Sequence, residues 1–457
     1  MDVSLRTERP TQTFPRLGYR SHTASRLAML VMVSGLCGDV PVQAQCQPPC
    51  VEAVEVVASG VGVPGDTLAG AGDGWGGHQS RIVRMSSGEV FVSWLVPGRA
   101  RNKAVWRVAR RAGGQWDVVG TDMAGREPAS LLRTPDDRLL VVAWPEGRPV
   151  LWTGVVQRHS VRWTREDIPG PWVTLDSYYG AAGISVGGRL CVLESADAAK
   201  GQSPAFIIAC RNTSRTGTRT WASVRRDLPK RFAYAYVIPE DSALFWVANR
   251  DVLWTELGLQ RPSARGGAYV YNSIRLWSDS ARTDGSLIEQ VIRGEEPSRR
   301  GDFVYAFARD FVKDGAAMHV IYNALGPDTR NGDYELRHAF IRSGRTLWDE
   351  PLPSPIATDD SFHRLILSGS HQLFWLFGMG STVMIYPSQG EDGRYFEPGV
   401  RLDMRGHRVG YSGISVAAPR GGTPWSDRLD FVFPSEGKVI YARIRLAETS
   451  GATSHKE

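Results

Sequence analysis

Residues 76–95, with the sequence GGHQSRIVRMSSGEVFVSWL, decide the fold of this chain because they predict two short strands around a tight turn. The turn residues are Ser-Ser-Gly at positions 86–88. After the turn, Val90, Val92 and Trp94 alternate with other side chains at the strand period of two. The stretch is therefore predicted to be a β-hairpin.

Similar hairpin sequences recur along the chain. Counted from His78, they begin at residues 128, 180, 234, 305, 362 and 410, so the steps are 50, 52, 54, 71, 57 and 48 residues. Repeats of roughly 40 to 50 residues with about four strands each are typical of β-propeller blades. Seven hairpins predict an all-β, seven-bladed propeller with almost no helix. An insertion at residues 261–285 makes the fourth repeat ambiguous, so six blades remain the alternative.

A lone strand is predicted at residues 51–60, before the first hairpin. Residues 438–448 predict the third strand of the last repeat. Because a propeller ring must close and an exposed strand edge is a liability, we expect the N-terminal strand to complete the last blade. Residues 45–448 are thus expected to form a single propeller domain, and residues 449–457 a flexible tail.

The N-terminal residues have the features of an export signal. Three arginines precede the apolar run LAMLVMVSGL at residues 27–36, and residues 42–44 (VQA) have the small-residue spacing of a signal-peptidase site. We therefore predict a signal peptide over residues 1–44, cleaved near Ala44. The apolar run is far shorter than the roughly 20 residues of a transmembrane helix. The sequence predicts a secreted or periplasmic protein that is not bound to a membrane.

Removing the signal peptide leaves Cys46, Cys50, Cys191 and Cys210. An even number of cysteines in an oxidising compartment indicates disulfides. Cys191 and Cys210 fall on adjacent predicted strands, so a disulfide between them is expected, and Cys46 and Cys50 can close the loop CQPPC. A zinc site would need two more ligands near either pair, and the sequence offers none there. We expect no required cofactor, and a structural metal ion is left open.

The charge of the chain is mildly basic, with 54 Lys and Arg against 48 Asp and Glu. The formal charge of +6 includes five Arg and three acidic residues in the predicted signal peptide, so the mature chain is near +4. The basic residues are scattered and do not form a stripe interleaved with aromatic residues, which argues against a nucleic-acid partner. An acidic polymer remains a candidate ligand, and a monomer is expected.

Tryptophans in the turn between the third and fourth strands form a second repeat. Clear instances are SRTGTRTW at residues 214–221 and SGRTLW at residues 343–348. At these positions the chain resembles the sialidase superfamily of BNR-repeat propellers, whose blades carry Ser-x-Asp-x-Gly-x-Thr-Trp boxes, with Thr216 in place of the aspartate. The resemblance implies the propeller fold more strongly than any function.

In such propellers the ligand site lies over the central axis, where the innermost strands begin and the second strands end. Residues about ten positions before the hairpin turns meet this condition. Together with residues near the same level, they are His78, Glu127, Tyr178, Tyr234, Tyr305, Asp359 and Tyr411 on the first strands, and Arg99, Glu194, Arg250 and Asn323 on the second. The set combines His, Tyr, Arg and carboxylate groups, which is chemically richer than a packed axis requires. Single members at strand ends also fit a structural role.

Elimination on a uronate polymer needs a cation for the carboxylate, together with a base and an acid. Residues 234–251 resemble the hairpin of BNR-repeat propellers that include ulvan lyases, and residues 307–348, with His319 and His338, resemble their next blade. The resemblance implies that Arg250 pairs with the uronate while His78 and Tyr234 share proton abstraction and donation. The substrate-binding residues are then expected to be Arg99, Glu127, Tyr178, Tyr305, Asn323, Asp359 and Asp360.

Two other functions stay open. A sialidase-type glycosidase needs three arginines, the first in an Arg-Ile-Pro phrase. Arg81 begins a similar phrase, but three residues too close to the turn, so His78 takes the level of that arginine and the arginine triad of a sialidase is not expected. Hydrolysis by Glu127, Asp359 and Asp360 is left open as a separate alternative. A platform that binds acidic polysaccharide or another glycan without cleaving it would use Trp stacking surfaces, although most of the 15 Trp are expected in the core. A catalytic site should gather His78, Tyr234 and Arg250 in one pocket, whereas a platform should scatter them.

Overall fold

The computed structural model describes residues 47–60, 77–97, 104–125, 129–158, 160–173, 180–196, 203–213, 220–253, 256, 269–279, 288–294, 305–325, 335–353, 362–390, 392–409 and 414–447. The chain divides into two compact units, Met1–Gln45 and Cys46–Glu457, and every described residue belongs to the second. The expected signal peptide at residues 1–44 and tail at residues 449–457 lie outside the described residues.

The first three hairpin repeats each form one antiparallel sheet of four strands in chain order. The first sheet contains β2 (Ile82–Arg84), β3 (Val90–Pro97), β4 (Ala104–Ala112) and β5 (Gln115–Ala124). The second contains β6 (Ser130–Arg133), β7 (Leu139–Ala143), β8 (Val150–Val156) and β9 (Val161–Asp167), with the 3₁₀ turn η1 (Pro145–Gly147) between β7 and β8. The third contains β10 (Gly180–Ile184), β11 (Arg189–Ala196), β12 (Ala205–Asn212) and β13 (Ala222–Asp227).

One turn geometry recurs between first and second strands and explains the repeated hairpin sequence. In residues 85–89 the amide of Met85 donates to the carbonyl of Glu89 at 2.8 Å, and the amide of Gly88 donates to the carbonyl of Met85 at 3.0 Å. The same pair of hydrogen bonds closes residues 134–138, 185–189 and 368–372. The fourth residue of each turn has a positive φ, which Gly, Asp and His adopt more readily than β-branched residues. These residues are Gly88 (86°), Asp137 (56°), Gly188 (93°) and His371 (64°).

The remaining repeats form three further sheets. An eight-stranded sheet contains β14 (Phe232–Pro239), β15 (Leu244–Leu253), β16 (Tyr269–Ser278), β17 (Ile288–Arg293), β18 (Tyr305–Asp314), β19 (Ala317–Leu325), β20 (Glu335–Arg342) and β21 (Arg345–Pro351). A five-stranded sheet contains β22 (Phe362–Leu367), β23 (Leu373–Met379), β24 (Thr382–Gln389), β25 (Tyr395–Phe396) and β26 (Val400–Arg401). The last contains β27 (Ser415–Val416), β28 (Arg428–Ser435), β29 (Lys438–Arg445) and β1 (Cys50–Ser59).

The all-β propeller class is confirmed, but the predicted number of separate blades is corrected. Five sheets are single blades of four or five strands, whereas the sixth sheet has eight strands. The eight strands belong to one sheet because β16 and β18 form a parallel bridge at Asn272 and Ala306, which joins two antiparallel groups. The hairpin count therefore did not translate into seven independent sheets.

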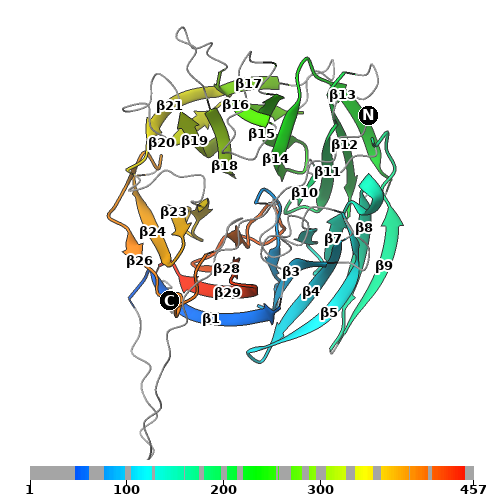
Figure 1. Ribbon diagram of the computed structural model, residues 1–457, viewed down its shortest axis with the longest axis vertical. Coiled ribbons are helices and arrows are strands. Elements are labelled where there is room, and N and C mark those ends of the chain that lie inside the picture. The colour runs from blue at the N-terminus through cyan, green and yellow to red at the C-terminus, as the bar shows by residue number, and fades with distance from the viewer. Residues whose placement is uncertain are drawn as a thin grey trace, which may run out of the picture. The chain divides into compact units, whose positions relative to one another are not determined.

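The N-terminal strand closes the ring, as predicted. β1 pairs antiparallel with β29 from Cys50↔Arg445 to Ser59↔Lys438. In Figure 1 the blue strand β1 lies directly beside the red strand β29, and the sheets of this unit follow one another around a common centre. Apolar clusters lie between neighbouring sheets, as expected when blades bury their faces only against each other.

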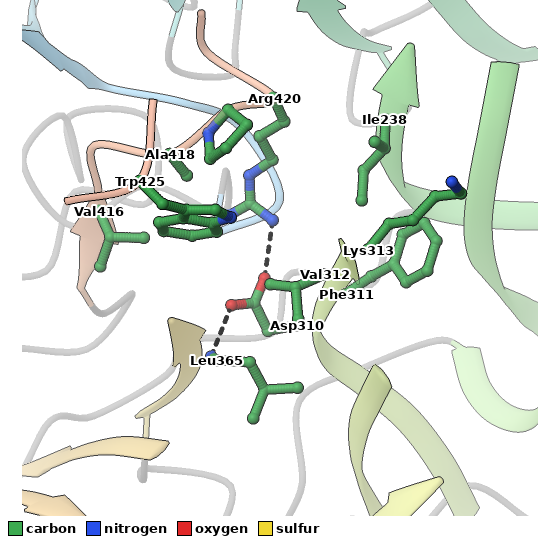
Figure 2. A pocket seen from close by; sticks show the side chains of 11 residues that line it. Ile238, Asp310, Phe311, Val312, Lys313, Leu365, Val416, Ala418, Arg420 and Trp425 are labelled. Carbon is green, nitrogen blue, oxygen red and sulfur yellow. Dashed lines mark hydrogen bonds and ion pairs between the residues drawn. The ribbon is translucent and has the colours of Figure 1, made fainter. Parts of the chain in front are cut away.

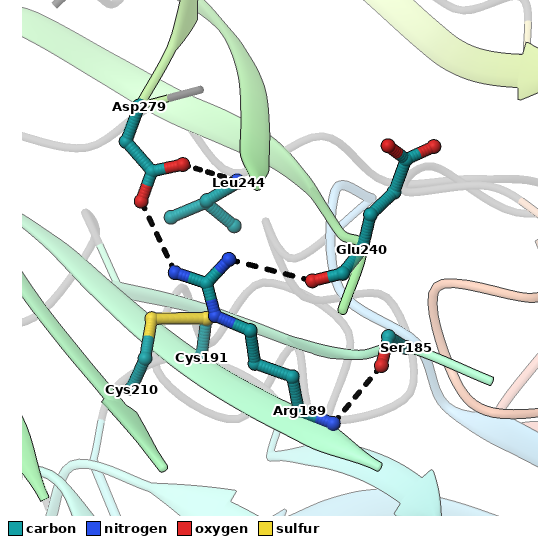
Figure 3. Close-up of a disulfide and its surroundings, with 7 residues drawn as sticks. All are labelled: Ser185, Arg189, Cys191, Cys210, Glu240, Leu244 and Asp279. Carbon is teal, nitrogen blue, oxygen red and sulfur yellow. Dashed lines mark hydrogen bonds and ion pairs between the residues drawn. A yellow bond between two sulfur atoms is a disulfide. The ribbon is translucent and has the colours of Figure 1, made fainter. Parts of the chain in front are cut away.

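The predicted disulfide between Cys191 and Cys210 is confirmed. The two residues are direct partners on β11 and β12, and their Cα atoms are 4.2 Å apart. Figure 3 shows the bond beside Arg189, whose guanidinium pairs with Asp279 at 3.2 Å. Cys50 is also disulfide-bonded, while Cys46 lies outside the described residues.

The connection between β27 and β28 crosses the ring at the turn ends of the innermost strands. The carbonyls of Arg420 and Gly421 accept from the amides of Ile184 (2.9 Å) and Arg133 (2.8 Å), the last residues of β10 and β6. Gly422 makes this close approach possible, because it has a φ of 83° and a Cβ there would lie 2.0 Å from the carbonyl oxygen of Arg133. This segment, residues 417–427, is called the axial loop below.

Candidate active site

The structure brings two of the predicted catalytic residues together at the end of the axis where the innermost strands begin. The rings of His78 and Tyr234 contact edge to face, with centroids 5.7 Å apart and planes at 78°. His78 Nε2 lies 3.1 Å from the carbonyl oxygen of Gly180, the first residue of β10, and Gln79 Nε2 donates to the same oxygen at 2.9 Å. Because a carbonyl oxygen only accepts, Nε2 carries a hydrogen.

Tyr234 owes its position to an irregular backbone. Its φ is 55°, a left-handed value that is uncommon for a bulky residue. The register between β14 and β15 also shifts between Ala233 and Tyr236, as in a β-bulge. Bulges re-aim side chains, and strained residues cluster at functional sites. Here the ring reaches His78 from β14 and packs on Tyr271 and Phe307, each with centroids 5.7 Å away.

Arg250, the third predicted catalytic residue, lies on β15 next to this bulge. Its register partner on β14 is Phe232, two residues before Tyr234, and its neighbour Asn249 pairs with Ala233. The backbone of Arg250 is therefore at the same end of the sheet as Tyr234. Its role toward a uronate stays a prediction.

Tyr305 and Asn323, two predicted substrate-binding residues, lie on neighbouring strands at this end of the axis. Tyr305 begins β18, and its ring centroid is 6.5 Å from those of Tyr271 and Phe307. Asn323 on β19 is the register partner of Phe307. Its amide oxygen accepts from Arg309 Nη2 at 2.8 Å and Nε at 3.3 Å. The five predicted residues Arg99, Glu127, Tyr178, Asp359 and Asp360, like Tyr411, lie outside the described residues.

Sequence reasoning missed the arginines of the axis. Arg364 on β22 is buried and donates to four backbone carbonyls, those of Gly77 (2.8 Å), Arg309 (2.6 Å), His363 (2.8 Å) and Ile414 (2.6 Å). Two of these carbonyls lie on β18 and β22, and the other two lie in the segments before β2 and β27, so one guanidinium links the backbone of different blades. No spacing rule in the sequence marks this residue, because its partners are backbone groups.

The charges of these arginines affect the pKa values of neighbouring side chains. Burial and the positive charges of Arg309 and Arg364 hold the pKa of His363 well below its usual range, so this imidazole stays neutral. Burial raises the pKa of Tyr236. The charge of Arg364 lowers it, that of Asp310 raises it, and those of Arg420 and Arg309 lower it. The Tyr236 hydroxyl donates to the carbonyl oxygen of Arg309 at 2.7 Å.

The axial loop occupies the other end of the axis. Arg420 Nη1 donates to Asp310 Oδ1 at 2.7 Å, and the amide of Leu365 donates to Asp310 Oδ2 at 2.9 Å (Figure 2). The cavity around this ion pair, lined also by Trp425 and Lys313, measures about 30 Å³. That volume suits one or two waters and not a sugar ring. The cavity at this end is therefore too small to hold a sugar chain, whereas at the other end His78 and Tyr234 are both buried.

His319 and His338 form a separate pair on the strands that follow β18 in the sheet. His319 Nδ1 and His338 Nε2 are 3.0 Å apart, on β19 and β20. His338 packs edge to face on Trp348, with centroids 4.8 Å apart. Burial lowers the pKa of His319 to about 4 and that of His338 well below its usual value. The pair is a neutral, packed element.

Two broader features can be stated for the described part of the chain. Among those residues, no three His, Cys, Asp or Glu side chains are grouped as metal ligands. The same residues contain no helix with the length and apolar character needed to cross a membrane.

Known proteins resemble this chain in fold and not in sequence. No protein-family model and no curated protein matches the sequence. The structure of the polysaccharide lyase Uly1 is similar with a TM-score of 0.50 and 9% identity, covering 80% of this chain and 90% of that chain. Hydrazine synthase of Kuenenia stuttgartiensis has a TM-score of 0.49 and 14% identity, covering 84% and 98%. An α-L-arabinanase of Penicillium chrysogenum, complexed with arabinobiose, has a TM-score of 0.41 and 10% identity, covering 87% and 99%. At these identities the likeness shows the β-propeller fold alone.

Proposed function

We propose that the protein cleaves a uronate-containing polysaccharide by β-elimination, with His78 and Tyr234 as the proton-transfer groups. The observation that carries the proposal is the contact between the two rings, 5.7 Å apart, which the fold assembles from distant parts of the chain. A histidine and a tyrosine are suitable for general acid–base work when both reach the same reacting group. The fold similarity to the polysaccharide lyase is compatible with this chemistry.

The reaction requires three contributions. A cation next to the uronate carboxylate makes the C5 proton more acidic, and Arg250 is proposed for this task. One of the pair His78 and Tyr234 removes the C5 proton, a double bond forms between C4 and C5, and the C4–O bond breaks. The other member donates a proton to the leaving oxygen. Aromatic rings of Tyr271, Tyr305 and Phe307 supply surfaces on which sugar rings can pack.

The protein is proposed to act outside the cytoplasm. The disulfide between Cys191 and Cys210 supports an oxidising compartment. The predicted signal peptide at residues 1–44 agrees with this location. A polysaccharide too large to enter a cell would be a suitable substrate there.

The deciding experiment exposes the protein to polymers of glucuronate, galacturonate, mannuronate and iduronate. Elimination gives an unsaturated uronate with ultraviolet absorbance, and each cleavage also gives one reducing end. New reducing ends without that absorbance would support a glycoside hydrolase instead. Binding of a polymer without cleavage would support a glycan-binding platform.

A further inference from the structure

The tryptophans of the second sequence repeat link neighbouring sheets, a role that the proposed mechanism does not use. Each lies near the start of the outermost strand of its sheet or directly before it. Three of them donate a hydrogen bond from Nε1 to the outermost strand of the preceding sheet of the ring. The pairs are Trp116 with Glu55 on β1 (2.9 Å), Trp163 with the carbonyl oxygen of Val119 on β5 (2.9 Å) and Trp221 with Glu166 on β9 (2.7 Å). The fourth, Trp348, packs on Phe340 of its own sheet.

Two of these links also contain an arginine and have the same chemistry. Arg111 donates to Glu55 from Nη2 (2.6 Å) and from Nε (2.8 Å). Arg211 donates to Glu166 from Nη1, at 2.7 and 2.8 Å to the two carboxylate oxygens. Each carboxylate thus accepts from a guanidinium and an indole, and hydrogen bonds to an ionised acceptor are strong. The closing clasp is the set Glu55, Arg111 and Trp116, and the internal clasp is the set Glu166, Arg211 and Trp221.

The two clasps hold strands of different kinds. β9, which carries Glu166, follows β8 through a short turn in which the amide of Gln157 donates to the carbonyl of Ser160 at 2.8 Å. β1, which carries Glu55, pairs among the described strands with β29 alone, from the other end of the chain. Its register with β29 shifts twice, once on either side of Glu55. The closure of the ring therefore lacks the hairpin that keeps β9 in place.

The closing clasp also contacts the strand that pairs with β1. Tyr441 on β29 is the register partner of Glu55. The centroid of the Tyr441 ring lies 5.2 Å from that of Trp116 and 5.5 Å from Arg111 Cζ. The first sheet therefore holds β1 and β29 at the same point.

The carboxylate of Glu55 is partly shielded from solvent and is ionised at neutral pH. The side chains of Glu55 and Arg111 are 22% and 25% exposed. Burial raises the pKa of Glu55, but the hydrogen bonds from Arg111 and Trp116, together with the charges of Arg111 and Arg443, lower it below its usual value of 4.5. The ion pair should therefore contribute more than a fully exposed pair does.

We propose that the closing clasp is the latch of the propeller ring. While Glu55 is held, β1 stays paired with β29; when Glu55 is released, β1 separates from β29 and the other sheets remain folded. Proteins open locally at their least stable segments, and an edge strand without a hairpin is such a segment. The latch does not depend on the proposed elimination, because it acts on the fold and not on a substrate.

Hydrogen–deuterium exchange, measured by mass spectrometry of peptides, tests the latch. Glu55→Gln removes the charge and keeps the size of the side chain. It should speed exchange in β1 and β29 about tenfold or more, since hydrogen bonds between charged groups are lost. Exchange in β7 and β23, the second strands of two other sheets, should stay as in the native protein. Glu166→Gln makes the same change in the internal clasp and should leave exchange in β1 unaltered.

Trp116→Phe is a milder variant, and it serves if Glu55→Gln does not fold. It removes the hydrogen bond from Nε1 but keeps an aromatic ring on Tyr441, so β1 and β29 should exchange faster by a smaller factor. Trp221→Phe is its matched control and should leave β1 unaltered. Native exchange of β1 in either closing-clasp variant, an equal increase in all sheets, or an equal increase of β1 exchange in Glu166→Gln would overturn the latch.

Discussion

The carbonyl oxygen of Gly180 lies 3.1 Å from His78 Nε2, although Gly180 begins β10 and His78 precedes β2 in another sheet. The hydrogen bond fixes the imidazole plane so that its edge meets the ring of Tyr234. A general base or acid needs such a fixed orientation to transfer a proton within reach of substrate. The arrangement therefore gives specific expectations for both residues.

Replacing Tyr234 by Phe should abolish elimination while the fold remains intact, because only the hydroxyl is removed. Loss of a general acid or base typically reduces the rate by about 10² to 10⁴. The rate of appearance of unsaturated product measures this effect, and far-ultraviolet circular dichroism monitors the fold. Tyr395→Phe, at an exposed tyrosine on β25, is the matched control and should keep full activity. A Tyr234→Phe variant with unimpaired turnover would remove this residue from the mechanism.

Gly422→Ala should destabilise the protein more than Gly406→Ala. Both glycines have a positive φ, 83° and 80°, so both substitutions introduce backbone strain on the order of 1 kcal/mol. Only at Gly422 would the new Cβ also collide with the carbonyl oxygen of Arg133, whereas the space around Gly406 is open. Urea unfolding of the two variants gives the comparison. Equal losses would show that the axial loop can shift without cost.

The hairpins could be predicted because each one is determined by residues that are close together in the sequence. Turn residues such as Ser-Ser-Gly at positions 86–88 and the alternating strands after them depend on neighbours in sequence, and the same turn indeed recurs. The bridge between Asn272 and Ala306 was not predictable, since one parallel pair depends on how two whole groups of strands pack. It changed the number of sheets without changing any hairpin.

The candidate site was predictable in part for the same reason. Counting back ten residues from the turns led to His78 and Tyr305, although the strands before these turns, β2 (Ile82–Arg84) and β18 (Tyr305–Asp314), differ in length. The count missed Arg309 and Arg364, which lie inside strands and contact backbone carbonyls and an amide. Tyr234 was found by resemblance, but its positive φ and the bulge that aims it have no signature in the sequence.

Acid should destabilise the protein through the histidine pair. The pKa of His319 is about 4 in the folded protein, below the usual value of 6.5, because burial disfavours its charged form. The unfolded chain therefore binds more protons, so the stability from neutral His319 is complete above about pH 6.5 and is lost as the pH falls toward 4. The loss should be roughly 3 kcal/mol. Urea unfolding at pH 7 and pH 4 measures it, and His319→Gln should show a weaker dependence on pH. An identical dependence in this variant would assign the acid sensitivity to other groups.

Glu194 should act in the opposite direction, because its carboxyl group is buried on β11 directly across from Gly180. Among the described residues, neither carboxylate oxygen accepts a hydrogen bond with normal distance and angles. The Val173 backbone lowers the pKa and so partly offsets the effect of burial. Burial raises the pKa of Glu194 to about 8, so the folded protein keeps the proton that the unfolded chain releases near 4.5. This stability is complete below about pH 4.5 and is lost as the pH rises through 8, by a few kcal/mol in total.

Since Gly180 holds His78, ionised Glu194 should also disturb the site, and activity should fall at alkaline pH. Glu194→Gln, which stays neutral at every pH, should be more stable than the native protein at pH 9 and keep its activity there. Glu166→Gln, at an exposed carboxylate on β9, is the control and should retain the native alkaline loss. Parallel pH profiles of stability for the native protein and Glu194→Gln would show that Glu194 is not the group responsible.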